Sequence, residues 1–167
     1  MHSPKESNAV EILSGPFTFR LKALRNNAFS LKSIAPFIES QPSIIEWMQC
    51  AREKAPSPNF QLPPSIVPNL QSLTCTTREL ESIPPLPTIS HLKILSFLNG
   101  KEQELQTIQL LLRFGGTLKS LALFREMSER SLLLEHLVVQ VAKSIPHLIR
   151  FAIRHKGETV SCSAASN

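Results

Sequence analysis

Histidine and cysteine are the residues of this chain most able to do chemistry, because they ligate metals, transfer protons and act as nucleophiles. The five histidines are widely spaced, and none lies at metal-ligand spacing from another histidine or a cysteine. His91 and His147 each precede an apolar motif residue, where a turn is expected, and His136 lies within an apolar helical stretch. The histidines therefore indicate structural or solvated positions, and we expect no metal site.

The three cysteines, Cys50, Cys75 and Cys162, are odd in number and contain no C-x-x-C pair. This pattern predicts a reducing compartment and no disulfide framework. Cys75 falls on an apolar motif position, where cysteine behaves as a small hydrophobe. Cys50 follows a short apolar stretch and is expected to be more exposed. Neither lies beside a cationic cluster that would activate a thiolate, so the sequence disfavours a cysteine nucleophile.

Two absences argue further against catalysis. All 13 acidic residues are Glu, so the chain has no Asp. Asp is the usual third member of a Ser-His-Asp triad and a common ligand of hydrolytic Mg²⁺ sites, although Glu can substitute. Only five glycines occur, and the stretch 114–117, FGGT, is explained by a helix end rather than by a phosphate-binding loop. We predict that the chain is not an enzyme and needs no cofactor.

Charge and length define the class of molecule. The 167 residues are 42% hydrophobic and 19% charged, with a net charge of +5, which fits one ordered domain of mildly basic character. No apolar stretch approaches the roughly 18 residues of a membrane span, and the N-terminus does not resemble a signal peptide. We therefore expect an intracellular protein, cytoplasmic or nuclear, with no membrane partner.

An apolar pattern recurs along the chain: an apolar residue, two spacers, a second apolar residue, one spacer and a third. Six units carry it, at 21–26, 44–49, 70–75, 92–97, 118–123 and 148–153. The first two are degraded, because Asn26 and Gln49 occupy the third position. The units begin 22 to 30 residues apart, near the roughly 20–29 of leucine-rich repeats. Trp47 replaces a motif leucine, which indicates core packing more strongly than a binding hot spot.

Helical periodicity fills the intervals between units. We expect a helix over 101–114, with Leu105, Ile108, Leu111 and Leu112 on one stripe and with Asn99 and Glu102 capping its start. Gly115 and Gly116, which tolerate positive φ, should end it. A second helix is expected over 33–41, with Pro36 in its first turn. A third is expected over 78–83, after a capping box formed by Thr76 and Glu79. A fourth is expected over 128–145, with Leu133, Leu137 and Val141 facing inward. Proline clusters at 56–68 and 84–87 read as loops.

Short strands alternating with helices predict an α/β fold. We expect an irregular leucine-rich-repeat-like solenoid with parallel strands on its inner face and helices outside. The domain organisation is an N-terminal extension over 1–15, a repeat domain of about six units over 16–155 and a flexible polar tail over 156–167. The tail offers no obvious cap for the last strand, so a fragment of a longer array is an alternative.

The strand residues between motif positions should point outward to solvent. Ile94, Leu98 and Phe124 then fall on adjacent units and predict an exposed apolar patch. The alternative is that a loop or the tail covers this patch. The predicted partner-binding residues are Ile94, Leu98, Phe124, Met48, Arg25, Arg150 and Arg154.

The chain resembles the leucine-rich-repeat region of fungal F-box-type proteins, especially the basidiomycete group. The resemblance covers roughly residues 16–155 and is carried by the run from Phe19 to Trp47, by PNLQSL and by ISHLKILSF with LLLRFGGTLKSLAL. It implies a protein-binding arm that recognises substrates for a ubiquitin ligase. Residues 1–15 hold no F-box-like helical segment opening with Leu-Pro, which puts recruitment of the ligase adaptor in doubt.

A non-catalytic protein-interaction module is therefore the predicted function. A basic nucleic-acid-binding module is the alternative, although the chain lacks interleaved exposed aromatic residues and any nucleic-acid motif. The residues that keep this alternative open are Lys22, Arg25, Lys93, Lys119, Arg150 and Arg154.

Overall fold

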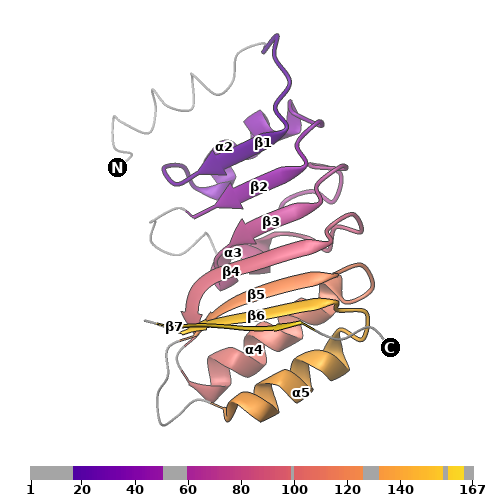
Figure 1. Ribbon diagram of the computed structural model, residues 1–167. Helices are drawn as coiled ribbons and strands as arrows, with labels where there is room; N and C mark the ends of the chain where they lie inside the picture. Colours follow the sequence, from indigo (N-terminus) through magenta and orange to yellow (C-terminus); the bar gives the residue numbers. More distant parts are fainter. Residues whose placement is uncertain (1–16, 51–59, 99, 126–131, 156–157, 164–167) are drawn as a thin grey trace, which may run out of the picture.

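The computed structural model describes residues 17–50, 60–98, 100–125, 132–155 and 158–163, and its strands form one sheet (Figure 1). The seven strands are β1 (Ala23–Asn26), β2 (Glu46–Gln49), β3 (Ser72–Cys75), β4 (His91–Leu98), β5 (Ser120–Arg125), β6 (Arg150–His155) and β7 (Glu158–Ser163). They follow one another across the sheet in chain order. The first six are parallel, and β7 is antiparallel to β6.

Among the described residues, helices occur in four of the five crossovers between neighbouring parallel strands, all except that from β2 to β3. The helices are α2 (Leu31–Glu39), α3 (Thr77–Ser82), α4 (Lys101–Leu111) and α5 (Leu134–Ser144), and a 3₁₀ turn, η1 (Leu112–Phe114), extends α4. Figure 1 shows α4 and α5 running side by side next to the last strands. The mixed α/β class predicted from the sequence is confirmed, with a parallel sheet and accompanying helices.

The core lies on one face of the sheet, where the strand register aligns the motif residues in rows. The second motif position forms one row, consisting of Leu24, Trp47, Leu73, Leu92, Leu121 and Phe151. These side chains and the inner faces of the helices belong to a single hydrophobic cluster. Trp47 is only 2% exposed, so its predicted core position is confirmed.

The third row begins with two amides instead of apolar side chains. Asn26 and Gln49 are both buried, and the Asn26 Nδ2 group donates to Gln49 Oε1 over 2.7 Å. Both side-chain amides also donate to the carbonyl oxygen of Phe29, and Asn26 Oδ1 accepts from the Phe29 amide. The two units with amides at the third position therefore follow the same register as the other units. Their polar side chains can be buried because hydrogen bonds satisfy them.

The unit at β4 has a different register from the predicted one. Ile89, Leu92 and Ile94 take the three motif positions, and all three are buried. The pairing of β4 with β5 shifts between Ile94 and Phe97, which is the signature of a β-bulge. Beyond this irregularity Leu98 also faces the core. The prediction that the motif runs from Leu92 to Phe97 is wrong, because the true frame begins three residues earlier.

Two short helices start with side-chain caps. The Ser30 hydroxyl accepts from the Ser33 amide at the start of α2. Pro36 lies well inside this helix rather than in its first turn, which corrects the prediction; its ring nitrogen has no N–H to donate to the preceding turn. At α3 the predicted capping box is confirmed, because Glu79 N donates to Thr76 Oγ1 and Thr76 N donates to Glu79 Oε2.

The predicted inner stripe of α4 is only partly right. The buried residues are Glu104, Thr107, Ile108 and Leu111, whereas Leu105 is half-buried and Leu112 is 55% exposed. The N-cap is Gly100, with φ of 95°, and Asn99 lies outside the described residues. Gly115 has a φ of −59°, so it does not end the helix in the left-handed region; Gly116 has no positive φ either.

The last helix and strand also refine the prediction. In α5, Leu137 and Val141 are buried as expected, but Leu133 is 68% exposed because the helix begins after it. The stretch 156–167, expected to be a flexible tail, contains β7, which pairs with the edge of β6. In the part of the chain that the structure describes, no helix has the length and apolar character that crossing a membrane requires.

Candidate functional site

The face of the sheet opposite the core is the candidate functional site. Strand side chains alternate between the two faces, so every second residue of β1 to β6 points away from the helices. We call this surface the open face; its residues are Ala23, Arg25, Glu46, Met48, Ser72, Thr74, His91, Lys93, Ser120, Ala122, Phe124, Arg150, Ala152 and Arg154. All of them are exposed or half-buried.

Two of the predicted partner-binding residues do not belong to the open face. Ile94 is 0% exposed and Leu98 is 2% exposed, so both lie in the core. The frame shift in β4 is the physical reason, because a wrong register assigns side chains to the wrong face. The predicted apolar patch of Ile94, Leu98 and Phe124 is therefore wrong. Lys93 occupies the open face of β4 instead.

The other five predicted residues lie on the open face in two groups. Arg25 and Met48 are direct neighbours on β1 and β2. Phe124, Arg150 and Arg154 lie on β5 and β6, where Phe124 is paired with Arg154. Small side chains on β3, Ser72 and Thr74, lie between the two groups. Small side chains on β5, Ser120 and Ala122, lie beside the second group.

A cation–aromatic arrangement dominates the second group. The Lys93 ammonium lies 5.5 Å from the centroid of the Phe124 ring, and the Arg154 guanidinium carbon lies 5.7 Å from it. The face of an aromatic ring carries negative charge density, which attracts both cations. Arg150 is exposed on the same face of β6, four residues before Arg154. We call Lys93, Phe124, Arg150 and Arg154 the basic cluster.

No carboxylate among the described residues forms a salt bridge with the three cations of the basic cluster. The nearest acidic side chain in the open-face rows is Glu46, on β2, two strands from β4. The cluster therefore presents uncompensated positive charge on the β4–β6 half of the face. In the sequence Lys93 is only one of several dispersed basic residues, because its placement beside Phe124 and Arg154 depends on the strand register.

A second charged group lies on the core side and was not foreseen. Arg125 Nε donates to Glu104 Oε1 over 2.6 Å, and these residues are 3% and 0% exposed. The Arg125 guanidinium also donates to the Leu132 carbonyl, and the Leu132 amide donates to Glu104 Oε2 over 2.8 Å. The alternation Leu121, Leu123, Arg125 was the sequence signal for an inward arginine. The pair joins β5, α4 and the approach to α5.

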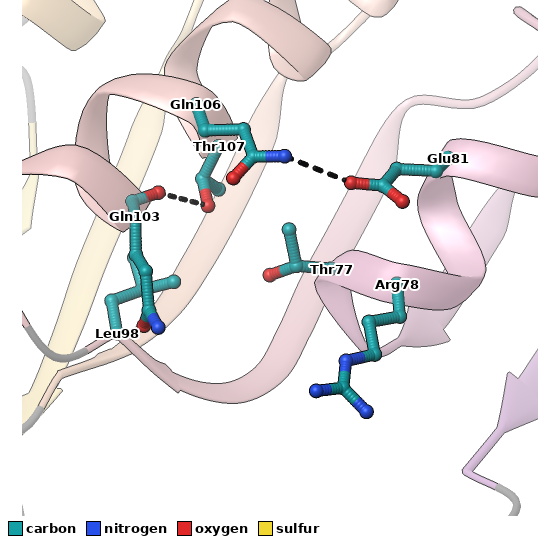
Figure 2. Close-up of a pocket in the computed structure, with 7 residues that line it drawn as sticks. All are labelled: Thr77, Arg78, Glu81, Leu98, Gln103, Gln106 and Thr107. Carbon is teal, nitrogen blue, oxygen red and sulfur yellow. Dashed lines mark hydrogen bonds between the residues drawn. The ribbon is translucent and has the colours of Figure 1, made fainter. Parts of the chain in front are cut away.

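Leu98 borders a pocket between α3 and α4, of about 440 Å³ (Figure 2). Its other lining residues are Thr77, Arg78, Glu81, Gln103, Gln106 and Thr107. Gln106 Nε2 donates to Glu81 Oε1 over 3.0 Å across the two helices, and Figure 2 shows Arg78 pointing away from this bond. The lining is largely polar, and the Thr107 hydroxyl donates to the Gln103 carbonyl oxygen over 2.8 Å.

Cys75, the motif cysteine of β3, lies fully buried in the core. Burial raises the pKa of the Cys75 thiol well above its ordinary value, and the Glu79 carboxylate and Cys50 raise it further. That thiol stays protonated and inaccessible. Within the described residues, no three His, Cys or Glu side chains come together to hold a metal ion.

Comparisons with protein-family models, with curated proteins and with solved structures found no match. The resemblance to the repeat region of F-box-type proteins thus stays a prediction.

Proposed function

We propose that this protein is a non-catalytic protein-recognition module and that its partner binds to the open face. The observation that carries the proposal is the composition of this face. Small side chains such as Ser72, Thr74 and Ala122 form a floor, and larger charged and aromatic side chains rise at both ends. A continuous surface of this kind suits contact with another protein better than enclosure of a small molecule.

The proposal includes a leucine-rich-repeat-like solenoid of about six irregular units. Its support is the order of the strands, because each parallel strand lies beside its sequence neighbour and the motif positions align in rows. Stacked units of this type offer extended faces that bind proteins. We further propose a role like that of the substrate-recognition arm of F-box-type ubiquitin-ligase components, located in the cytoplasm or nucleus.

The non-catalytic part of the proposal rests on particular side chains. Cys75 is buried with a raised pKa. The buried carboxylate of Glu104 is engaged by Arg125 and by the Leu132 amide, so it is not available as a general base.

Site-specific photo-crosslinking tests the proposal. A photoreactive phenylalanine analogue is introduced at Ala122 or Ala152 on the open face, and at the exposed Gln109 on α4 as a matched control. The variants are expressed in the cells that produce the protein, irradiated and purified under denaturing conditions. We expect the same discrete protein adduct from Ala122 and Ala152 and none from Gln109. Immunodetection of the ligase adaptor in the purified material tests the F-box-type role separately.

The opposite pattern would contradict the proposal. Adducts from Gln109 alone would place the partner on the helices. Adducts with nucleic acid in place of protein would support the alternative nucleic-acid-binding function. No adduct from either open-face position would argue against recognition through this face.

A further inference from the structure

The chemistry of the basic cluster indicates what kind of partner segment the open face binds. Lys93 on β4 and Arg154 on β6 lie over the ring of Phe124, and Arg150 lies on the same face of β6, four residues before Arg154. None of the three cations forms a salt bridge with a carboxylate of the described chain. Their mutual repulsion is relieved only partly by the ring, so a partner that supplies negative charge gains electrostatic energy here.

We propose that the basic cluster binds an acidic segment of a partner protein, in which carboxylates recur along an extended chain. This inference rests on the proposed function and adds the chemical class of the partner. Carboxylates match the cluster because arginine presents paired N–H donors to them and lysine adds a point charge.

The spacing of the cluster fits this occupant. Neighbouring strands are about 4.8 Å apart, and Arg154 lies two residues further along β6 than Ala152, the position level with Lys93. The backbones at Lys93 and Arg154 are therefore separated by about 12 Å. In an extended segment, side chains on one side recur about every 7 Å. Two carboxylates in a Glu-x-Glu arrangement can therefore reach Lys93 and Arg154 together, since all four side chains are long and flexible. The small side chains of Ala122 and Ala152 leave room for the segment above the floor.

The same geometry disfavours single-stranded nucleic acid, which binds through stacking of bases on open aromatic rings as well as through charge. The Phe124 ring already lies close to two cations, one from β4 and one from β6. The basic residues of the cluster lie on β4 and β6, and Glu46 on β2 lies between them and the strand of Arg25, so the positive charge does not form a continuous track for a phosphate backbone.

Fluorescence anisotropy with the full chain tests the inference. The probe is a labelled decapeptide of alternating Glu and Ser, and the uncharged probe replaces each Glu with Gln. The cluster variant is Lys93→Glu with Arg154→Glu, and the matched control, Lys32→Glu with Lys143→Glu, changes the net charge equally at exposed positions of α2 and α5, away from the open face. We expect the cluster variant to lose at least about tenfold in affinity for the Glu peptide, because like charges then face each other. The control should bind within about twofold of the wild type, and the Gln peptide should not bind.

A milder variant, Lys93→Gln with Arg154→Gln, covers the case in which charge reversal prevents folding, and it should weaken binding in the same direction. The inference fails if the Glu peptide does not bind at low salt, or if both charge reversals weaken it equally. It also fails if a ten-nucleotide poly-dT strand binds as tightly and depends on the same residues. Photo-crosslinking from Ala122 in the cluster variant separates the two proposals: a retained protein adduct would leave protein recognition standing and remove only the acidic segment.

Discussion

Leu121 lies in the middle of the second motif row, between Leu92 on β4 and Phe151 on β6, and is 1% exposed. Replacing it with Ala removes buried methyl groups and leaves a cavity that neighbouring strands cannot close. We expect Leu121→Ala to lower the free energy of unfolding by about 2–5 kcal/mol, measured by urea denaturation. Leu112→Ala is the control, because Leu112 is 55% exposed and should change stability by less than about 0.5 kcal/mol. Equal effects would show that the row is misassigned.

Cys75 links pH to stability. Its pKa is raised in the folded protein, chiefly by burial. Above about pH 8.5, where an exposed thiol ionises, the unfolded chain releases a proton that the folded chain keeps. Stability contributed by this thiol is thus complete below that pH and falls as pH rises toward the folded-state value, by at most about 1.4 kcal/mol per pH unit. The free energy of unfolding, measured by urea denaturation at several pH values between about 7 and 10, should decrease more steeply with pH for the wild type than for Cys75→Ala. Parallel slopes would contradict this linkage.

At the scale of elements, the buried pair of Glu104 and Arg125 holds α4 to the end of β5 and to residue 132. Glu104→Gln preserves the shape but leaves the guanidinium without a counter-charge. Breaking a buried pair in this way costs about 3–5 kcal/mol. The matched control is Glu102→Gln, an exposed position on the same helix. Chemical denaturation of both variants checks the prediction, and a loss below about 1 kcal/mol for Glu104→Gln would show that the pair is not energetically important.

The adjacent glycines after η1 give a second test of element packing. A Cβ atom at Gly115 would lie 3.0 Å from the carbonyl oxygen of Ser144, at the end of α5, whereas one at Gly116 would meet nothing within 4 Å. We expect Gly115→Ala to destabilise the protein by about 1 kcal/mol through crowding. Gly116→Ala should be neutral or stabilise it by up to about 1 kcal/mol, because alanine reduces the entropy of the unfolded chain. Thermal unfolding of the two variants decides, and equal melting temperatures would argue against the close approach.

Most strand registers could be predicted from the sequence because alternation and turn spacing agree in five of the six units. The β4 unit could not, because Ile89, Leu92 and Ile94 and the overlapping set Leu92, Leu95 and Phe97 fit the same spacing. Only pairing with β3 and β5 distinguishes the two frames. The wrong frame exchanged Ile94 for Lys93 on the open face and so turned a basic surface into an apparent apolar patch.

At the scale of the whole molecule, the strand order predicts a gradient of local stability. Strands β3 to β5 have parallel partners on both sides, whereas β1 pairs only with β2 among the described strands. We expect hydrogen–deuterium exchange, followed by mass spectrometry, to show slow exchange in β3 to β5 and fast exchange in β1. Protection of β1 equal to that of β4 would contradict this expectation and would indicate a partner on the β1 edge.

The class of fold followed from patterns within single segments, whereas the functional surface depended on contacts between segments. The basic cluster joins residues from β4, β5 and β6 that are up to 61 positions apart in the chain, from Lys93 to Arg154. The Asn26–Gln49 hydrogen bond and the β4 irregularity arise in the same way, from one strand meeting the next. Such features have no signature within one repeat unit.

The alternation of side chains along each strand separates two kinds of evolutionary change. Substitutions at Leu73, Leu121 or Ile153 are constrained by the fold, whereas their immediate neighbours Thr74, Ala122 and Ala152 face away from the core. Neighbouring positions in a strand are therefore under different selection. The binding specificity of the open face can change while the core residues keep the fold. An insertion of one residue within a strand has the opposite effect, because it would turn core residues toward the open face and open-face residues toward the core. Both the packing of the core and the binding surface would then be lost.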